Sequence, residues 1–173
     1  MPEDEVREAC LQLLAVRPRS RAELGQRLRR KGYETAQIEP VLDRLTQVEL
    51  IDDAAFAQSW VQSRHTYSGK GRRALAAELR LKGVDDAVAA AALAHVDDSS
   101  EEQRARELVR KRMRTMTVGP GAHDDAAILR KLVAMLARRG YRQEMALRVV
   151  REEIAHGGAD TARSRMSVRR LRV

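Results

Sequence analysis

The sequence predicts an all-α protein of three tandem three-helix, helix-turn-helix-like repeats, and three observations support this class. Helix-favouring residues dominate, because Ala occurs 26 times and Arg 28 times in 173 residues, while Gly and Pro together number 14. No segment alternates apolar and polar residues in the manner of a strand. A short helix-ending motif occurs three times at similar spacing, which indicates an array of similar units.

The repeated motif consists of two leucines four residues apart, a cation, a glycine and an apolar residue. Its copies span Leu24–Tyr33, Leu75–Val84 and Leu132–Tyr141. The leucines share one face of a helix, and the cation complements the helix dipole in the last turn. The three glycines, Gly32, Gly83 and Gly140, supply the left-handed conformation of a Schellman stop. The residue after each glycine should then pack on the second leucine.

Apolar periodicity places a helix on either side of the first motif, within a repeat assigned to residues 1–50. The opening helix carries Val6, Cys10, Leu13 and Leu14, and the closing helix carries Ile38, Val41, Leu42 and Leu45. Ser20 and Glu23 have the spacing of a capping box for the second helix. Pro40 is expected near the start of the third helix.

The second repeat is assigned to residues 51–97 and the third to residues 98–156. Turn residues at 68–71 and 118–121 separate their first and second helices. The outer helices of the third repeat carry Ala105, Val109, Met113, Met116, Ala146, Val149, Val150 and Ile154. Since about 50 residues cannot easily bury a core alone, neighbouring repeats are expected to share surface in an elongated array. Residues 157–173 are expected to be a flexible, Arg-rich tail.

Several classes of protein are excluded at this stage. No apolar run approaches the length of about 20 residues that spans a bilayer, so no membrane association is expected. The acidic N-terminus lacks a secretory signal, and the single cysteine, Cys10, cannot form an internal disulfide, so a cytoplasmic location is expected. No nucleophile is paired with a base, so neither catalytic residues nor a cofactor is expected.

Paired aspartates occur four times, at 52–53, 85–86, 97–98 and 124–125. Such pairs can hold Mg²⁺ or act as acid and base. Each pair nevertheless stands just before an apolar-periodic segment, where a helix N-terminus favours Asp, and this position favours capping. The four histidines have no metal-ligand spacing. Phe56 and Trp60, one helical turn apart, fit the core better than an exposed contact site.

The net charge of +8 is unevenly distributed. Residues 157–173 hold five Arg and one Asp, which is half of the net charge. In the repeats the cations crowd the second helix, and with two residues that precede it in the second repeat they form the candidate interface: Arg27, Arg29, Arg30, Lys31, Arg64, Lys70, Arg72, Arg73, Arg80, Lys82, Arg130, Lys131, Arg138 and Arg139.

A basic chain of helix-turn-helix-like units suggests DNA binding, but a base-reading module should have a basic helix after each glycine. Two of the three such helices are not basic. The helix after Gly32 exposes Gln37, Glu39, Asp43 and Arg44, and the helix from Asp85 to Val96 has no Lys or Arg. The repeated basic helix therefore favours a long acidic or phosphate-bearing surface over a short base sequence. Ordinary solvated helix faces remain the alternative interpretation.

The residues around the second motif resemble a known family. The run Ile51-Asp52-Asp53, Phe56-Ala57 and Trp60-Val61, followed by Lys82-Gly83-Val84, is similar to the central signature of the RecX family of RecA regulators, and the motifs at Gly32 and Gly140 resemble its outer repeats. The resemblance implies three tandem three-helix repeats without a catalytic site or cofactor. It also implies binding to RecA and its filament on DNA, and to DNA phosphate secondarily. We expect the protein to be a monomer.

The resemblance further implies inhibition of the ATPase, strand-exchange and coprotease activities of RecA, with effects on recombination, DNA repair and the SOS response. Our hypothesis is that the basic helices face the acidic protein surface and DNA phosphate in the groove of the filament. Two alternatives remain open at this stage: a helical protein that binds naked DNA without RecA, and a helical adaptor for another protein.

Overall fold

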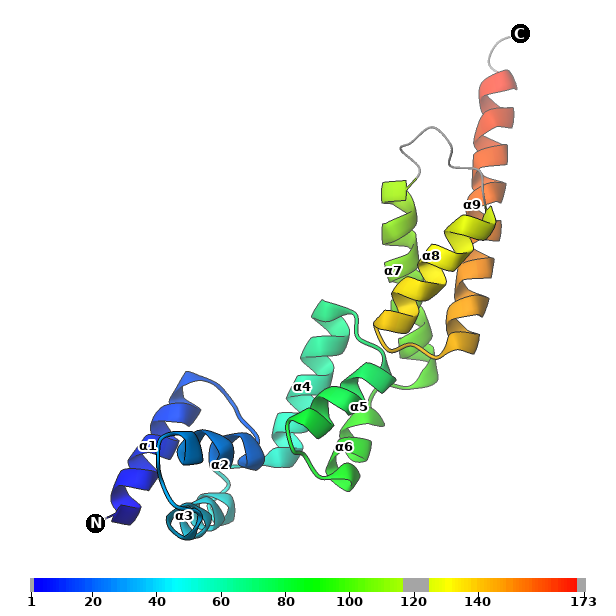
Figure 1. Ribbon diagram of the computed structural model, residues 1–173. Helices are drawn as coiled ribbons and strands as arrows, with labels where there is room; N and C mark the ends of the chain where they lie inside the picture. The colour runs from blue at the N-terminus through cyan, green and yellow to red at the C-terminus, as the bar shows by residue number, and fades with distance from the viewer. Residues whose placement is uncertain (1, 117–124, 171–173) are drawn as a thin grey trace. The chain divides into compact units, whose positions relative to one another are not determined.

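The chain folds into helices throughout the part that a computed structural model describes, which is the backbone of residues 2–116 and 125–170 (Figure 1). Side chains are described for residues 3–116 and 125–157. The helices of these segments are α1 (Pro2–Val16), α2 (Arg21–Arg30), α3 (Thr35–Gln47), α4 (Asp53–Ser68), α5 (Arg72–Leu81), α6 (Asp86–Leu93), α7 (Asp98–Met116), α8 (Asp125–Arg138) and α9 (Gln143–Arg170). This pattern confirms the all-α class.

Each repeat has its own cluster of buried apolar side chains. The first cluster joins α1, α2 and α3 through residues such as Val6, Cys10, Leu24, Ile38 and Leu42. The second contains Phe56, Val61, Leu75, Leu79 and Val84, and the third contains Val109, Leu132, Leu136, Tyr141 and Val149. Burial raises the pKa of the Cys10 thiol to about 11, so Cys10 acts as a core residue.

The three helix stops have the predicted Schellman geometry. After α2, the amide of Tyr33 donates to Leu28 O and that of Gly32 donates to Arg29 O. The same two hydrogen bonds recur after α5 at Val84 and Gly83, and after α8 at Tyr141 and Gly140. All three glycines have positive φ, at 97°, 68° and 88° along the chain, which explains why glycine stands there.

Two local predictions for the first repeat need correction. The capping box at Ser20 is half formed: Ser20 Oγ accepts from the amide of Glu23, but the Glu23 carboxylate binds Arg17 and Lys82 instead of returning to Ser20. A full capping box occurs at Glu34 and Gln37, before α3. It starts α3 at Thr35, so Pro40 lies inside the helix rather than in its first turn.

The last helix extends beyond the third repeat. Helix α9 is assigned to Arg170, through most of the segment 157–173, and the expected flexibility of this segment stays a prediction. The two alanines and five arginines of residues 157–173 favour helix, whereas each of the two glycines costs roughly 1 kcal/mol inside one. The predicted break at Val118–Gly121 lies outside the described residues.

The chain divides into two compact units that do not coincide with the repeats. Unit 1 comprises Met1–Arg64 and Leu75–Val96, and unit 2 comprises His65–Ala74 and Asp97–Val173. The end of α4, the following turn and the first residues of α5 therefore belong with the third repeat. Among the described residues, no helix is both long and apolar enough to cross a membrane.

Candidate functional site

The candidate cations separate into two groups by exposure. Five are partly buried: Arg64, Lys70, Arg72, Lys82 and Arg139. The other nine are exposed: Arg27, Arg29, Arg30, Lys31, Arg73, Arg80, Arg130, Lys131 and Arg138. The two groups differ in their contacts, because the partly buried side chains and their neighbours hold parts of each unit together.

Arg64 forms a fork-like pair with Glu78 inside unit 1. Its Nε and Nη2 donate to the two carboxylate oxygens at 2.9 and 2.7 Å, and this pairing raises the pKa of Arg64. The Trp60 indole donates to the same carboxylate at 2.9 Å and stacks on Phe56. Phe56 therefore lies in the core as predicted, whereas Trp60 lies at its edge with a polar contact.

Lys82 connects the end of α5 to the start of α2. Its ammonium lies 2.7 Å from Glu23 and 4.6 Å from the centre of the Trp60 ring. The carbonyl of Lys82 accepts from the Ser20 hydroxyl. A Cβ on Gly83 would lie 2.4 Å from the Cβ of Ala22, so the two helix ends touch. Burial would raise the pKa of Glu23, but hydrogen bonds from Lys82 and Arg17 lower it overall.

An equivalent junction occurs in unit 2, where the end of α8 meets the start of α5. The amides of Gly71 and Arg73 donate to Arg139 O and Gly140 O at 2.8 and 3.2 Å. A Cβ on Gly140 would lie 2.3 Å from the backbone nitrogen of Ala74. The side chain of Arg139 donates to Ser68 O, and the carbonyl of Lys70 accepts from His65 Nδ1.

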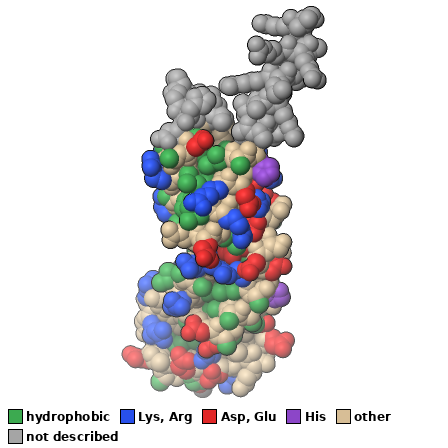
Figure 2. Space-filling view, turned by 90° about the vertical axis from the view of Figure 1, so that its right-hand side faces the viewer, with side chains coloured by type: hydrophobic (Ala, Val, Ile, Leu, Met, Phe, Trp, Pro, Cys, Tyr) green, Lys and Arg blue, Asp and Glu red, His purple; other side chains and the backbone are tan. Residues whose placement is uncertain are grey.

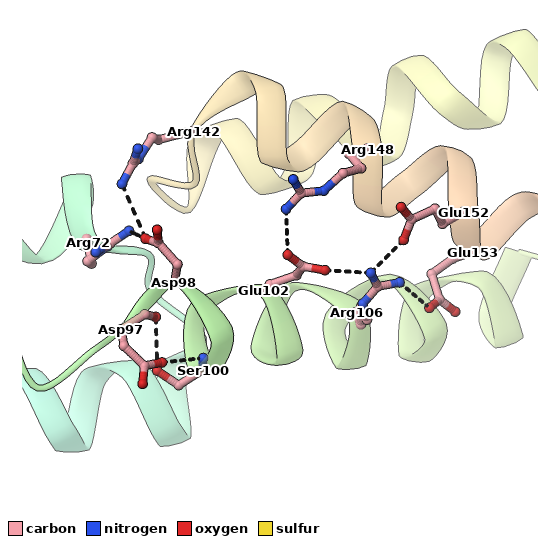
Figure 3. A network of polar contacts seen from close by, with 10 residues as sticks. All are labelled: Arg72, Asp97, Asp98, Ser100, Glu102, Arg106, Arg142, Arg148, Glu152 and Glu153. Atoms are coloured by element: carbon pink, nitrogen blue, oxygen red, sulfur yellow. Dashed lines mark hydrogen bonds and ion pairs between the residues drawn. The ribbon is translucent and has the colours of Figure 1, made fainter.

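Arg72 completes this junction through a buried carboxylate. Glu101, only 1% exposed, accepts from the amide and from the Nε of Arg72, both at 2.8 Å. Arg72 also pairs with the exposed Asp98, which in turn meets Arg142 (Figure 3). In unit 1 the Asp53 carboxylate corresponds to Glu101, because it accepts from the first amide of α2, that of Arg21, at 2.8 Å.

Arg64, Arg72 and Lys82 pair with carboxylates of the same chain. The nine exposed cations are therefore the better candidates for contact with another molecule. Within the described side chains, none of the nine forms an ion pair. Cationic and acidic side chains both occur among hydrophobic ones on the face drawn in Figure 2. No described side chain thus competes with an external anion for these nine cations.

Sequence reasoning missed an ion-pair network between α7 and α9 (Figure 3). Arg106 contacts Glu102, Glu152 and Glu153, and Arg110 also binds Glu153. Hydrogen bonds from Arg110 and Arg106 lower the pKa of Glu153, which is only 5% exposed. The four-residue spacing of Glu102 and Arg106 was the available signal, but the partners on α9 lie more than 40 residues away.

The aspartate pairs act as predicted at helix starts. Asp52 accepts from the amide of Ala55, Asp85 from that of Ala87 and Asp97 from that of Ser100. Asp53 instead serves α2, as described above. Asp124 lies outside the described residues. These contacts confirm the capping interpretation for the pairs that the structure describes.

The residues of the predicted signature pack in the cores or cap a helix. Ile51, 3% exposed, packs in the first core although it opens the second repeat. Phe56, Ala57 and Val61 are buried in the second core, and Asp52 caps α4. The signature thus specifies the start of one repeat and its attachment to the repeat before it.

Fold and surface together define a helical-repeat protein with three three-helix domains. Models of the first, second and third three-helix domains of RecX match residues 7–45, 52–93 and 100–150. The chain therefore belongs to the RecX family of regulatory proteins, and it is a non-enzymatic regulator.

Curated relatives and solved structures agree with this assignment. The chain is 51% identical over 154 residues to regulatory protein RecX of Mycolicibacterium smegmatis, covering 89% of this chain and 82% of the relative. It is 52% identical over 153 residues to regulatory protein RecX of Mycobacterium avium, covering 88% and 87%. The crystal structure of RecX from Lactobacillus salivarius has a TM-score of 0.77 at 22% identity, covering 89% of this chain and 97% of that one, and shows the same fold.

Proposed function

We propose that the protein binds RecA and the RecA filament on DNA, and that it inhibits the ATPase, strand-exchange and coprotease activities of RecA. It would thereby moderate homologous recombination, DNA repair and the SOS response, as a monomer in the cytoplasm and without a cofactor. The observation that carries the proposal is the 51% identity to a regulatory protein RecX over 89% of the chain.

The exposed cations support a contact with a polyanionic or acidic surface. They recur on α2, α5 and α8, which are the second helices of the three repeats. The helices that would read bases in a helix-turn-helix protein lack such a surface in two repeats: α3 carries one cation, Arg44, and α6 carries none. This distribution favours a filament lined by protein and phosphate over a base sequence.

The direct test is the ATPase activity of RecA on single-stranded DNA, with and without this protein. We expect inhibition that saturates as the protein approaches the concentration of RecA. Full ATPase activity at severalfold excess would contradict the proposal. An order-of-addition arm compares preformed filaments with free RecA, and so separates blocking of the groove from capping of the filament end.

The competing function, binding to naked DNA without RecA, is tested beside it. Titration of duplex DNA at several salt concentrations gives a slope that counts the phosphates neutralised. A steep slope and tight binding, together with unchanged RecA activity, would favour that function. The net charge of +8 is the observation that keeps it under test.

A further inference from the structure

A hollow of about 560 Å³ lies in unit 2 between the end of α7 and the outer face of α8. Five cations line it, namely Arg112, Arg130, Lys131, Arg138 and Arg139. No carboxylate belongs to the lining among the residues that the structure describes. The hollows of unit 1 differ, because one includes Glu39 and Asp53 and the other includes Asp4, Glu5 and Glu8.

The described side chains of unit 2 do not neutralise the charge in this hollow. Arg139 donates to the carbonyl of Ser68, but the other four cations form no ion pair with a described side chain. Glu102, Glu152 and Glu153 lie between α7 and α9 instead, where they pair with Arg106, Arg110 and Arg148. Among the described side chains, unit 2 therefore has ion pairs between α7 and α9 and unpaired cations along α8.

The floor of the hollow is apolar. Leu132 is fully buried beneath it, and Met116 and Met135 are partly buried against the same core. Methionine side chains adapt to partners of varied shape. A second hollow of about 560 Å³ shares Arg138 and adds Arg73, Val133 and Ala137, again without a carboxylate among its described lining residues. The two hollows thus follow α8, whose 14 residues extend about 21 Å.

The chemistry of this groove distinguishes between two kinds of anion. Single-stranded nucleic acid binds largely by stacking on aromatic rings. The one aromatic lining residue is Tyr141, which is 2% exposed and donates its hydroxyl hydrogen to Gly69 O. Duplex DNA offers phosphates to the cationic rim, but its few apolar groups, such as the thymine methyl, lie within the grooves and away from the phosphates. A peptide with carboxylates and an apolar side chain matches both features.

We propose that the α8 groove, defined by Arg112, Arg130, Lys131, Arg138, Met116 and Met135, binds an acidic protein segment that inserts an apolar side chain between the cations. Carboxylates pair with the arginines and Lys131, and the apolar side chain covers the two methionines. The inference deepens the proposed function and rests on it in one respect, since RecA is then the protein that supplies the segment.

The test uses the full-length protein and two fluorescent peptides of equal charge. Both peptides are rich in Glu and Asp, and one contains a central Leu where the other has Gly. Fluorescence anisotropy should show roughly tenfold tighter binding of the Leu peptide, the effect of partly burying one aliphatic side chain. Raising the salt concentration should lower the affinity for both peptides but preserve the ratio between the two affinities.

Two charge-reversal variants localise the site. Arg130→Glu with Lys131→Glu should lower the affinity for the Leu peptide by roughly tenfold or more. The matched control, Arg7→Glu with Arg44→Glu, changes two exposed cations of unit 1 that lie outside the candidate interface and should have less than about a twofold effect. Unchanged circular dichroism spectra and melting curves establish that both variants fold.

Equal binding of the two peptides would overturn the proposal, since charge alone would then suffice. An oligothymidylate that binds instead of the peptides, and is lost in the α8 variant, would overturn it in favour of a nucleic-acid site. The effect of the same variants on the RecA ATPase separates failure of the groove proposal from failure of the proposed function. If the peptide binds but no variant or wild-type protein inhibits RecA, the proposed function fails while the groove stands.

Discussion

In unit 1 the end of α5 meets the start of α2 mainly through side chains, whereas in unit 2 the end of α8 meets the start of α5 through the backbone. Ser20 and Glu23 hold Lys82 in the first case, and the amides of Gly71 and Arg73 hold two carbonyls in the second. Backbone contacts tolerate little movement. The junction of unit 2 should therefore depend more strongly on the sequence at its contact points.

Gly32, the remaining motif glycine, extends the comparison, because the end of α2 meets no other helix start among the described residues. A Cβ on Gly32 would meet nothing within 4 Å, although its φ is 97°. The same Schellman stop thus occurs with a backbone contact at Gly140, a side-chain contact at Gly83 and open space at Gly32. Substitution by alanine at the three sites separates conformational strain from steric contact.

The largest effect is expected for Gly140→Ala. The new Cβ would lie 2.3 Å from the Ala74 nitrogen, so the junction must open, and the positive φ adds strain. We expect a loss of about 4 kcal/mol from these two effects together. Urea denaturation followed by circular dichroism measures it. The fluorescence of Trp60, the sole tryptophan and a unit 1 residue, should report a smaller change.

A loss at Gly140 no larger than at Gly32 would contradict this expectation, because strain alone would then explain both. Gly83→Ala should fall between them. Its Cβ would meet the Ala22 Cβ alone, whereas the Cβ at position 140 would meet both the backbone nitrogen and the Cβ of Ala74.

The next largest effect compares the two carboxylates that cap a neighbouring second helix. Glu101→Ala removes a buried carboxylate from the amide and guanidinium of Arg72, and we expect a loss of about 3 kcal/mol. Asp53→Ala removes a half-buried cap from Arg21 and should cost about 1 kcal/mol. Chemical denaturation of both variants checks the order. Equal losses would show that burial of Glu101 does not strengthen its contact.

Acid should weaken both units through carboxylates with lowered pKa. Glu23 in unit 1 and Glu153 in unit 2 ionise more readily in the folded protein than their ordinary pKa of 4.5 predicts. Their stabilisation is therefore complete above that pH and is lost as the pH falls through their folded values. We expect a contribution of about 1 kcal/mol from each.

Denaturation between pH 6 and pH 3 measures this pH dependence. Glu23→Gln should flatten the pH dependence that Trp60 fluorescence reports, and Glu153→Gln should flatten that of the remaining circular dichroism signal. Unaltered pH profiles in both variants would exclude these two carboxylates as the cause.

The sequence predicted what depends on neighbouring residues and missed what depends on distant ones. The Schellman stops at Gly32, Gly83 and Gly140 need only local contacts, and all three were predicted correctly. The half-formed box at Ser20 could not be foreseen, because its hydroxyl and Glu23 bind Lys82, about 60 residues away. For the same reason the sequence did not predict which candidate cations are paired, because their carboxylate partners are distant in sequence and become neighbours only in the folded chain.

The smallest effect is expected for Gly32→Ala, where strain acts without a steric contact. An L-residue at this φ costs about 1–2 kcal/mol, but alanine also reduces the entropy of the unfolded chain, which offsets part of the cost. We expect a net loss of roughly 0.5–1 kcal/mol, measured by Trp60 fluorescence in urea. A loss as large as that of Gly83→Ala would mean that the end of α2 is covered in solution. In that case RecA binding by the variant would become the next measurement, because the covered end would be a further contact surface.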